Sequence, residues 1–361
     1  MACADSEPTT SVPTDAAIDQ RFDRGKDAFN SPEFSVDTDA TVIDMFLTFD
    51  QALHDQRIID EGLIDARVVD GSDIDASTPV TLNCLNDGFV GIPSLGPQYA
   101  QFGPTMGSHC SGTNHQAITG VERVVFVGDS VTVGTPPTDP MVYYRYLLAM
   151  QLAEHFGLQP PDWTWAQVNL IEGVSLSQEA GDFASCARWG ARTDDLLADN
   201  TLLTNCVPES ERSKKTLFVM TMGGNDISNL TQDGLDGASM EVLWAQTEEF
   251  IALMRDAVRW IKTPDNFPNG AYLVFANMFE FTDGTGDVTA CPAAGIAGFG
   301  AEWEDPDLLA NLVIWANEQF LKITVDTGSD MVFMLEHFCG HGFTHEDPNG
   351  RCYRGPNTEQ W

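Results

Sequence analysis

Apolar runs recur along the chain from residue 121 onward and alternate with longer amphipathic stretches. Short runs rich in branched and aromatic residues predict buried strands, here at 123–127, 165–171, 216–222, 271–277 and 331–335. The amphipathic stretches predict helices near 140–156, 193–200, 238–262 and 306–324. Five strands alternating with helices predict an α/β fold, a three-layer α/β/α sandwich with a five-stranded parallel sheet.

The first 120 residues lack this alternation. Residues 1–32 are rich in Ser, Thr, Pro and Asp, which predicts a disordered tether. Residues 33–120 form an acidic, loop-rich N-terminal extension with a helix expected at 40–60. Its repeated aspartates do not have the spacing of a calcium-binding helix–loop–helix motif, so we interpret them as a solvated acidic face, with calcium binding as the alternative. The main domain is expected to span residues 121–361.

Charge and hydropathy exclude several classes of partner. Acids outnumber bases 54 to 18, for a formal charge of −36. Such a charge repels nucleic acid and anionic membranes. No apolar run approaches the roughly 18 residues of a membrane span. These features favour solubility. The sequence leaves the oligomeric state open.

Three polar loops carry the candidate chemistry. Gly128-Asp129-Ser130 ends the first predicted strand, and Gly223-Gly224-Asn225-Asp226 ends the third. Between them, Gly190 precedes a helix start for which Thr193 is a candidate N-cap. A serine between a strand and a helix can present its hydroxyl in a cleft, near the positive end of the helix dipole. Each loop alone is also compatible with an ordinary glycine- or Asx-type turn.

The order of these three loops resembles the SGNH (GDSL-type) hydrolase family over roughly residues 120–340. Val131 stands where the family name implies leucine. The resemblance implies that Ser130 is the nucleophile. It also implies that the N–H groups of Ser130 and Gly190 and the side-chain amide of Asn225 stabilise the oxyanion, each by roughly 3–4 kcal/mol. Asp129 and Asp226 are expected to hold turns together.

The general base is the open question. The resemblance implies an Asp-x-x-His block, and no such block occurs in this sequence. One interpretation places the block after Trp361, so that this chain lacks the C-terminal end of the hydrolase domain. The other assigns the base to a histidine that follows the last strand, with an acidic orienter nearby. The histidines are His337, His341 and His345, with His341 favoured, and the orienters are Glu336, Glu346 and Asp347.

The eight cysteines favour an oxidising compartment, and no Cys-x-x-Cys pair indicates a zinc site. Nearby cysteines suggest the pairings Cys84–Cys110, Cys186–Cys206 and Cys339–Cys352, among many possible connectivities. The start Met1-Ala2-Cys3 followed by a polar stretch resembles that of a mature bacterial lipoprotein. Cys3 is then a lipid anchor or, alternatively, a simple terminal thiol. We expect a secreted, periplasmic or cell-surface protein.

The predicted function is serine-dependent hydrolysis of a carboxylic ester through an acyl-enzyme on Ser130. This reaction acts on a small-molecule, glycan or lipid ester and requires neither a metal nor an organic cofactor. The substrate classes left open are a lipid, a short acyl ester and an acetylated glycan. Loops at 135–140 and 279–303 are candidate pocket walls through Phe279, Phe281, Phe299 and Trp303, with ordinary loop packing as the alternative. A non-catalytic acyl- or glycan-binding protein on the same scaffold is the second hypothesis.

Overall fold

The computed structural model describes residues 96–108, 110–197, 201–279, 281–285, 306–350 and 352–359. The predictions for the tether 1–32, the helix at 40–60 and the lipid anchor Cys3 lie outside these residues. So do Phe299 and Trp303 of the expected pocket wall.

A mostly parallel sheet forms the centre of the described part, in the order β4-β5-β1-β6-β7-β8. Its strands are β1 (Arg123–Gly128), β4 (Glu179–Ala180), β5 (Phe183–Ala187), β6 (Thr216–Thr221), β7 (Ala271–Ala276) and β8 (Asp330–Val332). The short edge strand β4 is antiparallel to β5, and the remaining pairs are parallel. The predicted parallel sheet is therefore confirmed, with five parallel strands and the antiparallel β4 as a sixth.

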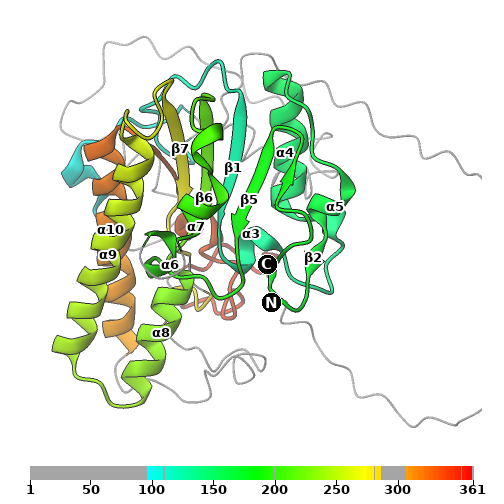
Figure 1. Cartoon of the computed structure of the whole chain (residues 1–361). Coiled ribbons are helices and arrows are strands. Elements are labelled where there is room, and N and C mark those ends of the chain that lie inside the picture. The colour runs from blue at the N-terminus through cyan, green and yellow to red at the C-terminus, as the bar shows by residue number, and fades with distance from the viewer. Residues whose placement is uncertain are drawn as a thin grey trace, which may run out of the picture.

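Helices cover both faces of this sheet (Figure 1). Strand β1 shows why, because Val124 and Phe126 pack toward α4 and α5, whereas Val125 and Val127 pack toward α9 and α10. The helices are α3 (Ser130–Val133), α4 (Tyr144–Phe156), α5 (Trp163–Ala166), α6 (Asp194–Leu197), α7 (Leu202–Cys206), α8 (Gly224–Leu235), α9 (Met240–Lys262), α10 (Pro306–Thr327) and α11 (Met334–Phe338). Short 3-10 turns are η2 (Tyr99–Phe102), η3 (Pro140–Val142) and η4 (Glu209–Glu211). The three-layer sandwich is confirmed.

The strand expected at 165–171 is wrong. Its first residues belong to α5, and the rest starts a small hairpin of β2 (Val168–Asn169) and β3 (Val174–Ser175). Asn169 turns the chain, because its side-chain oxygen accepts hydrogen bonds from the N–H groups of Ile171 and Glu172 (3.1 and 3.3 Å). The parallel strand of this region is β5, whose small residues carry little strand propensity.

The strand expected at 331–335 is correct only in its first half. Strand β8 ends at Val332, and α11 begins at Met334. At this point the backbone leaves the ladder, because the N–H of Leu335 donates to the side-chain oxygen of Asn277 (2.8 Å) and that of Phe333 donates to the carbonyl of Ser111 (2.9 Å). A buried side chain therefore ends the strand.

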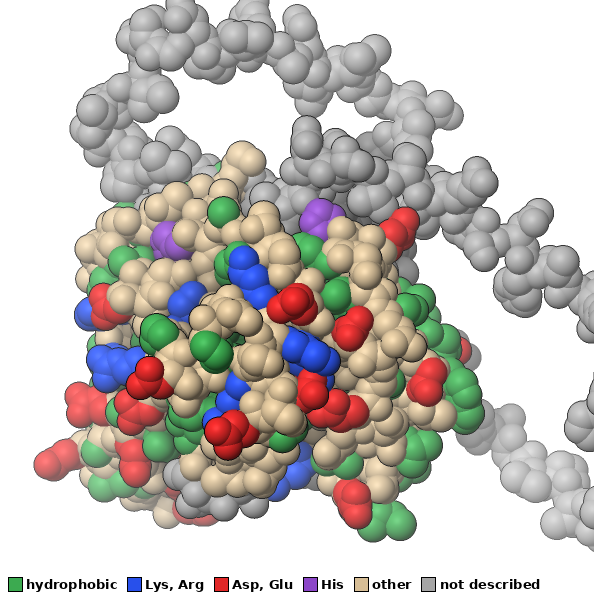
Figure 2. Space-filling model, turned by 45° about the horizontal axis from the view of Figure 1, so that its top comes forward, with side chains coloured by type: hydrophobic (Ala, Val, Ile, Leu, Met, Phe, Trp, Pro, Cys, Tyr) green, Lys and Arg blue, Asp and Glu red, His purple; other side chains and the backbone are tan. Residues whose placement is uncertain are grey.

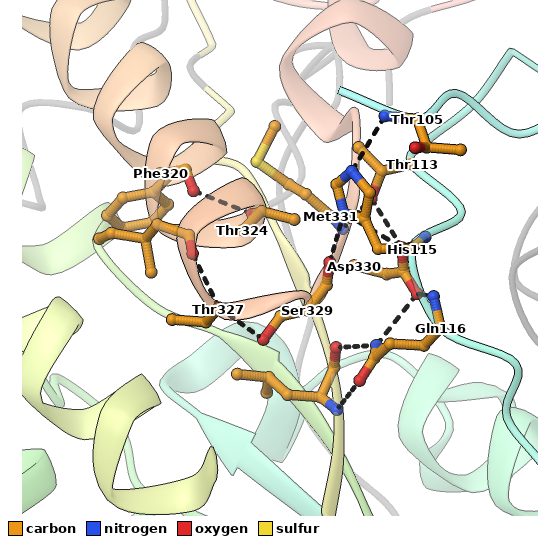
Figure 3. Close-up of polar contacts among 12 residues, drawn as sticks. Thr105, Thr113, His115, Gln116, Phe320, Thr324, Thr327, Ser329, Asp330 and Met331 are labelled. Atoms are coloured by element: carbon orange, nitrogen blue, oxygen red, sulfur yellow. Dashed lines mark hydrogen bonds and ion pairs between the residues drawn. The ribbon is translucent and has the colours of Figure 1, made fainter. Parts of the chain in front are cut away.

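Residues 105–116 are fastened to the start of β8 by one buried carboxylate, Asp330 (Figure 3). It accepts hydrogen bonds from the hydroxyl of Thr113 (2.9 Å), the N–H of His115 (2.6 Å) and the side-chain amide of Gln116 (3.0 Å). The ring of His115 is fixed as well, between the carbonyl of Ser329 and the N–H of Thr105. His115 is thus a structural histidine.

Basic and acidic side chains lie interspersed on the face shown in Figure 2. Ion pairs also occur below the surface. The buried guanidinium of Arg123, at the start of β1, pairs with the carboxylates of Glu179 (2.8 Å) and Glu211 (2.9 Å). These ion pairs connect the start of β1 to residues far away in the chain. Among the described helices, none has the length and apolar character needed to cross a membrane.

Candidate functional site

The three polar loops singled out in the sequence follow three neighbouring strands. Gly128, the last residue of β1, is paired with Ala187 of β5 on one side and with Thr221 of β6 on the other. Ser130, Gly190 and Asn225 come two, three and four residues after these partners. Because adjacent strands lie about 4.8 Å apart, the register brings the three loops together at the carboxyl edge of the sheet, where ligands of such folds bind.

Hydrogen bonds connect these loops to one another. The loop after β5 reaches the nucleophile turn (residues 128–134): the N–H of Arg188 donates to the carbonyl of Gly128 (3.0 Å). The indole N–H of Trp189 donates to the carbonyl of Gly134 (3.0 Å). On the other side, the side-chain amide of Asn225 donates to the carbonyl of Ala191 (2.9 Å). The three loops therefore form one connected unit.

Ser130 is the first residue of α3, a single helical turn. Asp129 precedes it as the N-cap, and its carboxylate accepts the N–H of Val131 (2.9 Å). Ser130 is half-buried, and its hydroxyl has no hydrogen-bond partner among the described residues. A half-exposed serine hydroxyl at a strand-to-helix turn is in the position that a nucleophile requires.

A buried arginine that sequence reasoning missed holds this turn. The guanidinium of Arg145 donates to the carbonyls of Thr132 (3.0 Å) and Val133 (3.2 Å) in the nucleophile turn. It also donates to the carbonyls of Trp165 (2.7 Å) and Ala166 (3.3 Å) in α5. Among the described residues no carboxylate pairs with it, and burial lowers the pKa of Arg145 to about 10. Its hydrogen bonds go instead to backbone groups that would otherwise be unsatisfied.

Gly190 and Asn225 line one open cleft of about 470 Å³. Gly190 has a φ of +72°, which favours glycine, and the space where a side chain would project from it is open. Asn225 donates one of its two amide hydrogens to Ala191, which leaves the other for a ligand. Ser130 is not among the residues that line this cleft. The remaining lining residues, which sequence reasoning did not single out, are Arg192, Asp195, Ser228, Asn229 and Gln232.

The two aspartates of the motifs are buried, Asp129 as the N-cap of α3 and Asp226 in the first turn of α8. Asp226 accepts hydrogen bonds from the N–H of Thr193 (3.2 Å) and from its hydroxyl (2.7 Å), so the Thr193 hydroxyl joins two loops. Burial raises the pKa of Asp129 to about 6 and that of Asp226 to about 6. Their contacts are those of residues that hold turns together.

The histidine segment (residues 339–345) follows α11, and Figure 1 shows this red part of the chain below the carboxyl ends of the strands. Nδ1 of His341 donates to the carbonyl of Glu359 (2.7 Å), because a carbonyl oxygen can only accept. The neutral ring therefore carries its proton on Nδ1 and its lone pair on Nε2, the tautomer of a general base. His345 makes the same type of contact with the carbonyl of Gly342 (2.9 Å).

One carboxylate and one disulfide anchor the histidine segment. Asp283 is buried and accepts hydrogen bonds from the N–H groups of Gly340 (2.8 Å), Gly342 (2.9 Å) and Thr344 (3.1 Å). The disulfide Cys339–Cys352 closes the segment onto the following loop. Asp283 was not identified from the sequence, because its role depends on contacts made more than 50 residues away in the chain.

The acidic residues proposed as orienters lie in different surroundings. Glu336 is buried, and its carboxyl accepts a hydrogen bond from the side chain of Asn277 (2.8 Å), so it faces the interior. Burial raises the pKa of Glu336. Glu346 and Asp347 are exposed, and Asp347 accepts the N–H of Asn349 (2.9 Å) in a local turn. The ring nitrogen Nδ1 of His341 instead has the backbone carbonyl of Glu359 as its hydrogen-bond partner.

The disulfides Cys186–Cys206 and Cys339–Cys352 form as the spacing suggests. Cys110 is also disulfide-bonded, to a cysteine outside the described residues, so its pairing with Cys84 stays a prediction. In the part of the chain that the structure describes, no group of three His, Cys, Asp or Glu side chains is placed to hold a metal ion.

Comparison with known proteins identifies the family of this chain. A family model for GDSL-like lipases and acylhydrolases matches residues 124–306, slightly more than half of the chain. An extracellular lipase from Streptomyces rimosus is 17% identical, with a TM-score of 0.31, over 62% of this chain and 84% of that one. A putative GDSL-like lipase from Parabacteroides merdae is 16% identical, with a TM-score of 0.28, over 55% and 98%. No curated protein matches. On the family match, the chain belongs to the GDSL-like lipase/acylhydrolase family.

Proposed function

We propose that this protein is a carboxylic ester hydrolase whose nucleophile is Ser130. The observation that carries the proposal is the register of the sheet: Ser130, Gly190 and Asn225 follow three adjacent strands whose ends are paired at Gly128. Membership of the GDSL-like lipase/acylhydrolase family supports ester hydrolysis in general.

In the proposed reaction the hydroxyl oxygen of Ser130 attacks the ester carbonyl and its proton passes to a histidine. The carbonyl oxygen becomes an oxyanion, held by the N–H groups of Ser130 and Gly190 and by the side-chain amide of Asn225. Each such donor lowers the barrier by about 3–4 kcal/mol. The alcohol leaves with the proton from the histidine, and water then releases the acid from the acyl-enzyme.

His341 is the proposed base within this chain, because its Nδ1–H donates to the carbonyl of Glu359 and its lone pair lies on Nε2. The alternative is that a histidine other than His341 is the base. The disulfides support a further part of the proposal, that the protein acts outside the cytoplasm, either secreted or at the cell surface.

The test is hydrolysis of p-nitrophenyl acetate by the 361-residue chain and by two pairs of variants. Ser130→Ala is matched by Ser213→Ala, an exposed serine before β6, at the opposite edge of the sheet. His341→Ala is matched by His155→Ala, in the last turn of α4. We expect Ser130→Ala to lose at least 1,000-fold in kcat/KM, on the order of 4 kcal/mol in barrier, and both controls to keep wild-type activity.

The histidine variant separates the two sources of the base. If His341→Ala loses the same activity, His341 is the base. If it retains activity, another histidine is. If the wild-type chain shows no hydrolysis above that of Ser130→Ala, a binding role on the same scaffold is favoured. Equal hydrolysis by wild type and Ser130→Ala contradicts the proposal.

A further inference from the structure

The cleft that contains Gly190 and Asn225 has an unusual lining. Small-molecule sites of 300–1,000 Å³ are lined mostly by apolar and aromatic side chains. This cleft, of about 470 Å³, is lined by one glycine and six residues with polar or charged side chains. A lining of this kind offers an apolar acyl chain no gain from burial, since the gain scales with apolar area removed from water.

One wall of the cleft is a stripe on α8. Asn225, Ser228, Asn229 and Gln232 are spaced i, i+3, i+4 and i+7, so they lie on one side of the helix. Leu230 and Thr231, on the opposite side, are buried. The stripe runs about 10 Å from Asn225, at 1.5 Å per residue. It begins at the proposed oxyanion donor and leads away from it.

The stripe presents amide groups that can both donate and accept. Asn229 donates to Asp233 of the same helix (3.1 Å), and Gln232 donates to Asp236, the C-cap residue of α8 (3.3 Å). These contacts use the nitrogen of each amide and orient it, while its carbonyl oxygen can accept from a ligand hydroxyl. Ser228, which precedes Asn229, adds a hydroxyl to the stripe.

The charges of the opposite wall are paired. Arg192 lies 2.6 Å from Asp194, and Asp195 lies 2.8 Å from Arg188. The two arginines and two aspartates balance, so the cleft does not hold an uncompensated positive charge for a phosphate or carboxylate. The guanidinium of Arg192 has further N–H groups that can donate to a neutral oxygen.

Resting on the proposed function, we infer that this cleft binds a neutral, hydroxyl-rich alcohol portion of the ester substrate, such as a sugar or another polyol. The acyl carbon lies at Ser130, and the hydroxyl groups of the alcohol extend along the stripe of α8. An acylated carbohydrate therefore fits the site better than a phospholipid or a long-chain acyl ester of an apolar alcohol.

The test is equilibrium binding to the Ser130→Ala variant, measured by calorimetry with two esters of equal acyl group. Methyl 6-O-acetyl-glucoside carries ring hydroxyls, and cyclohexylmethyl acetate has a six-membered ring without them. We expect the glucoside to bind at least ten-fold more tightly. The same measurement is made on Ser130→Ala combined with Asn229→Leu and Gln232→Leu, and on Ser130→Ala combined with Gln101→Leu, an exposed carboxamide of η2.

The inference holds if the Asn229→Leu and Gln232→Leu changes weaken glucoside binding at least ten-fold and the Gln101→Leu change does not. Equal binding of the two esters, binding of neither, or unchanged glucoside binding in the stripe variant overturns it. If the leucine pair unfolds the protein, Gln232→Ala alone is used, with an expected loss of about three-fold. The two claims are tested separately. Binding to Ser130→Ala requires no turnover and tests the cleft, whereas the p-nitrophenyl acetate assay tests the proposed hydrolysis.

Discussion

The nucleophile turn and the histidine segment are anchored by buried side chains of opposite charge. In the turn, Arg145 donates hydrogen bonds to backbone carbonyls. In the segment, Asp283 accepts hydrogen bonds from backbone N–H groups. In both places one charged side chain satisfies several backbone groups. The cation donates to carbonyl groups, and the anion accepts from N–H groups.

The difference lies in what surrounds each anchor. The nucleophile turn follows β1, which is paired with a parallel strand on either side, so its position is set by the sheet. The histidine segment follows α11 and is connected to the rest through Asp283 and the disulfide Cys339–Cys352. A loop positioned by the sheet register should resist local change better than a loop positioned by a few long-range contacts.

Arg145→Met should give the largest effect on stability. The substitution leaves four backbone carbonyls without their donor, and we expect a loss of about 3–5 kcal/mol in the free energy of unfolding. Urea denaturation measures it. The control is Arg259→Met on α9, whose exposed arginine lies 3.8 Å from Asp256, with an expected effect below about 0.5 kcal/mol. A loss below about 1 kcal/mol for Arg145→Met would mean that Arg145 does not anchor the turn.

Asp129 should make the stability depend on pH. Its pKa is raised by burial from 3.8 to about 6 in the folded protein, so the unfolded chain ionises first as pH rises. The unfolded state then binds fewer protons, and the contribution of Asp129 to stability falls between pH 4 and pH 6. Asp129→Asn should remove this fall, a relative gain on the order of 3 kcal/mol at pH 7.

Urea denaturation at pH 4, 5, 6 and 7 measures this difference. Asp256→Asn, at an exposed carboxyl of α9, is the control and should keep the wild-type pH profile. Parallel profiles for wild type and Asp129→Asn would show that ionisation of Asp129 is not coupled to folding.

Removing the disulfide of the histidine segment should loosen that segment alone. Cys339 and Cys352 are 13 residues apart, for which the loss of loop-closure entropy predicts about 3 kcal/mol. Hydrogen exchange of the paired Cys339→Ser and Cys352→Ser variant should show faster exchange at Gly340 and Gly342, with the nucleophile turn unchanged. The matched control replaces Cys186 and Cys206 with serine, which removes a disulfide that joins β5 to α7. Faster exchange in the nucleophile turn of the first variant would show that the two loops are coupled.

Asp283→Asn should have the smallest effect of the series. Its side-chain oxygen can still accept, but the new NH₂ group faces N–H donors, so we expect a loss of about 1–2 kcal/mol. Exchange at Gly340, Gly342 and Thr344 should rise together, since one carboxylate holds all three N–H groups. A rise at only one of these amides would show that Asp283 does not hold the segment as a unit.

The sequence predicted the strands and loops that are marked by local runs of apolar residues. The strands at 123–127, 216–222 and 271–277 are buried on both faces and rich in apolar residues, so their runs are continuous. The loops at their ends were visible because glycine and serine follow such runs abruptly. The family resemblance also predicts that Ser130, Gly190 and Asn225 belong to one site, and the strand register places their loops at the same edge of the sheet.

The parts that depend on single long-range contacts were not predictable. Strand β5 is short and consists mainly of small residues, whereas residues 168–171 look more like a strand but turn at Asn169. Arg145 looks in the sequence like any polar residue of an amphipathic helix, and only its burial shows that it holds two loops. The polar stripe of α8 was present as an i, i+3, i+4, i+7 pattern and is the one missed feature that the sequence carried.

The central claim is that Ser130 is the nucleophile of a site formed by three adjacent strand ends. The most direct measurement is reaction with a fluorophosphonate, followed by peptide mapping with mass spectrometry and by the p-nitrophenyl acetate assay on the same sample. The account predicts one adduct, on Ser130, whose extent matches the loss of hydrolysis, and no adduct in Ser130→Ala. The account would be contradicted if the untreated chain hydrolyses the ester and the reagent abolishes this activity by modifying another residue while Ser130 stays unmodified.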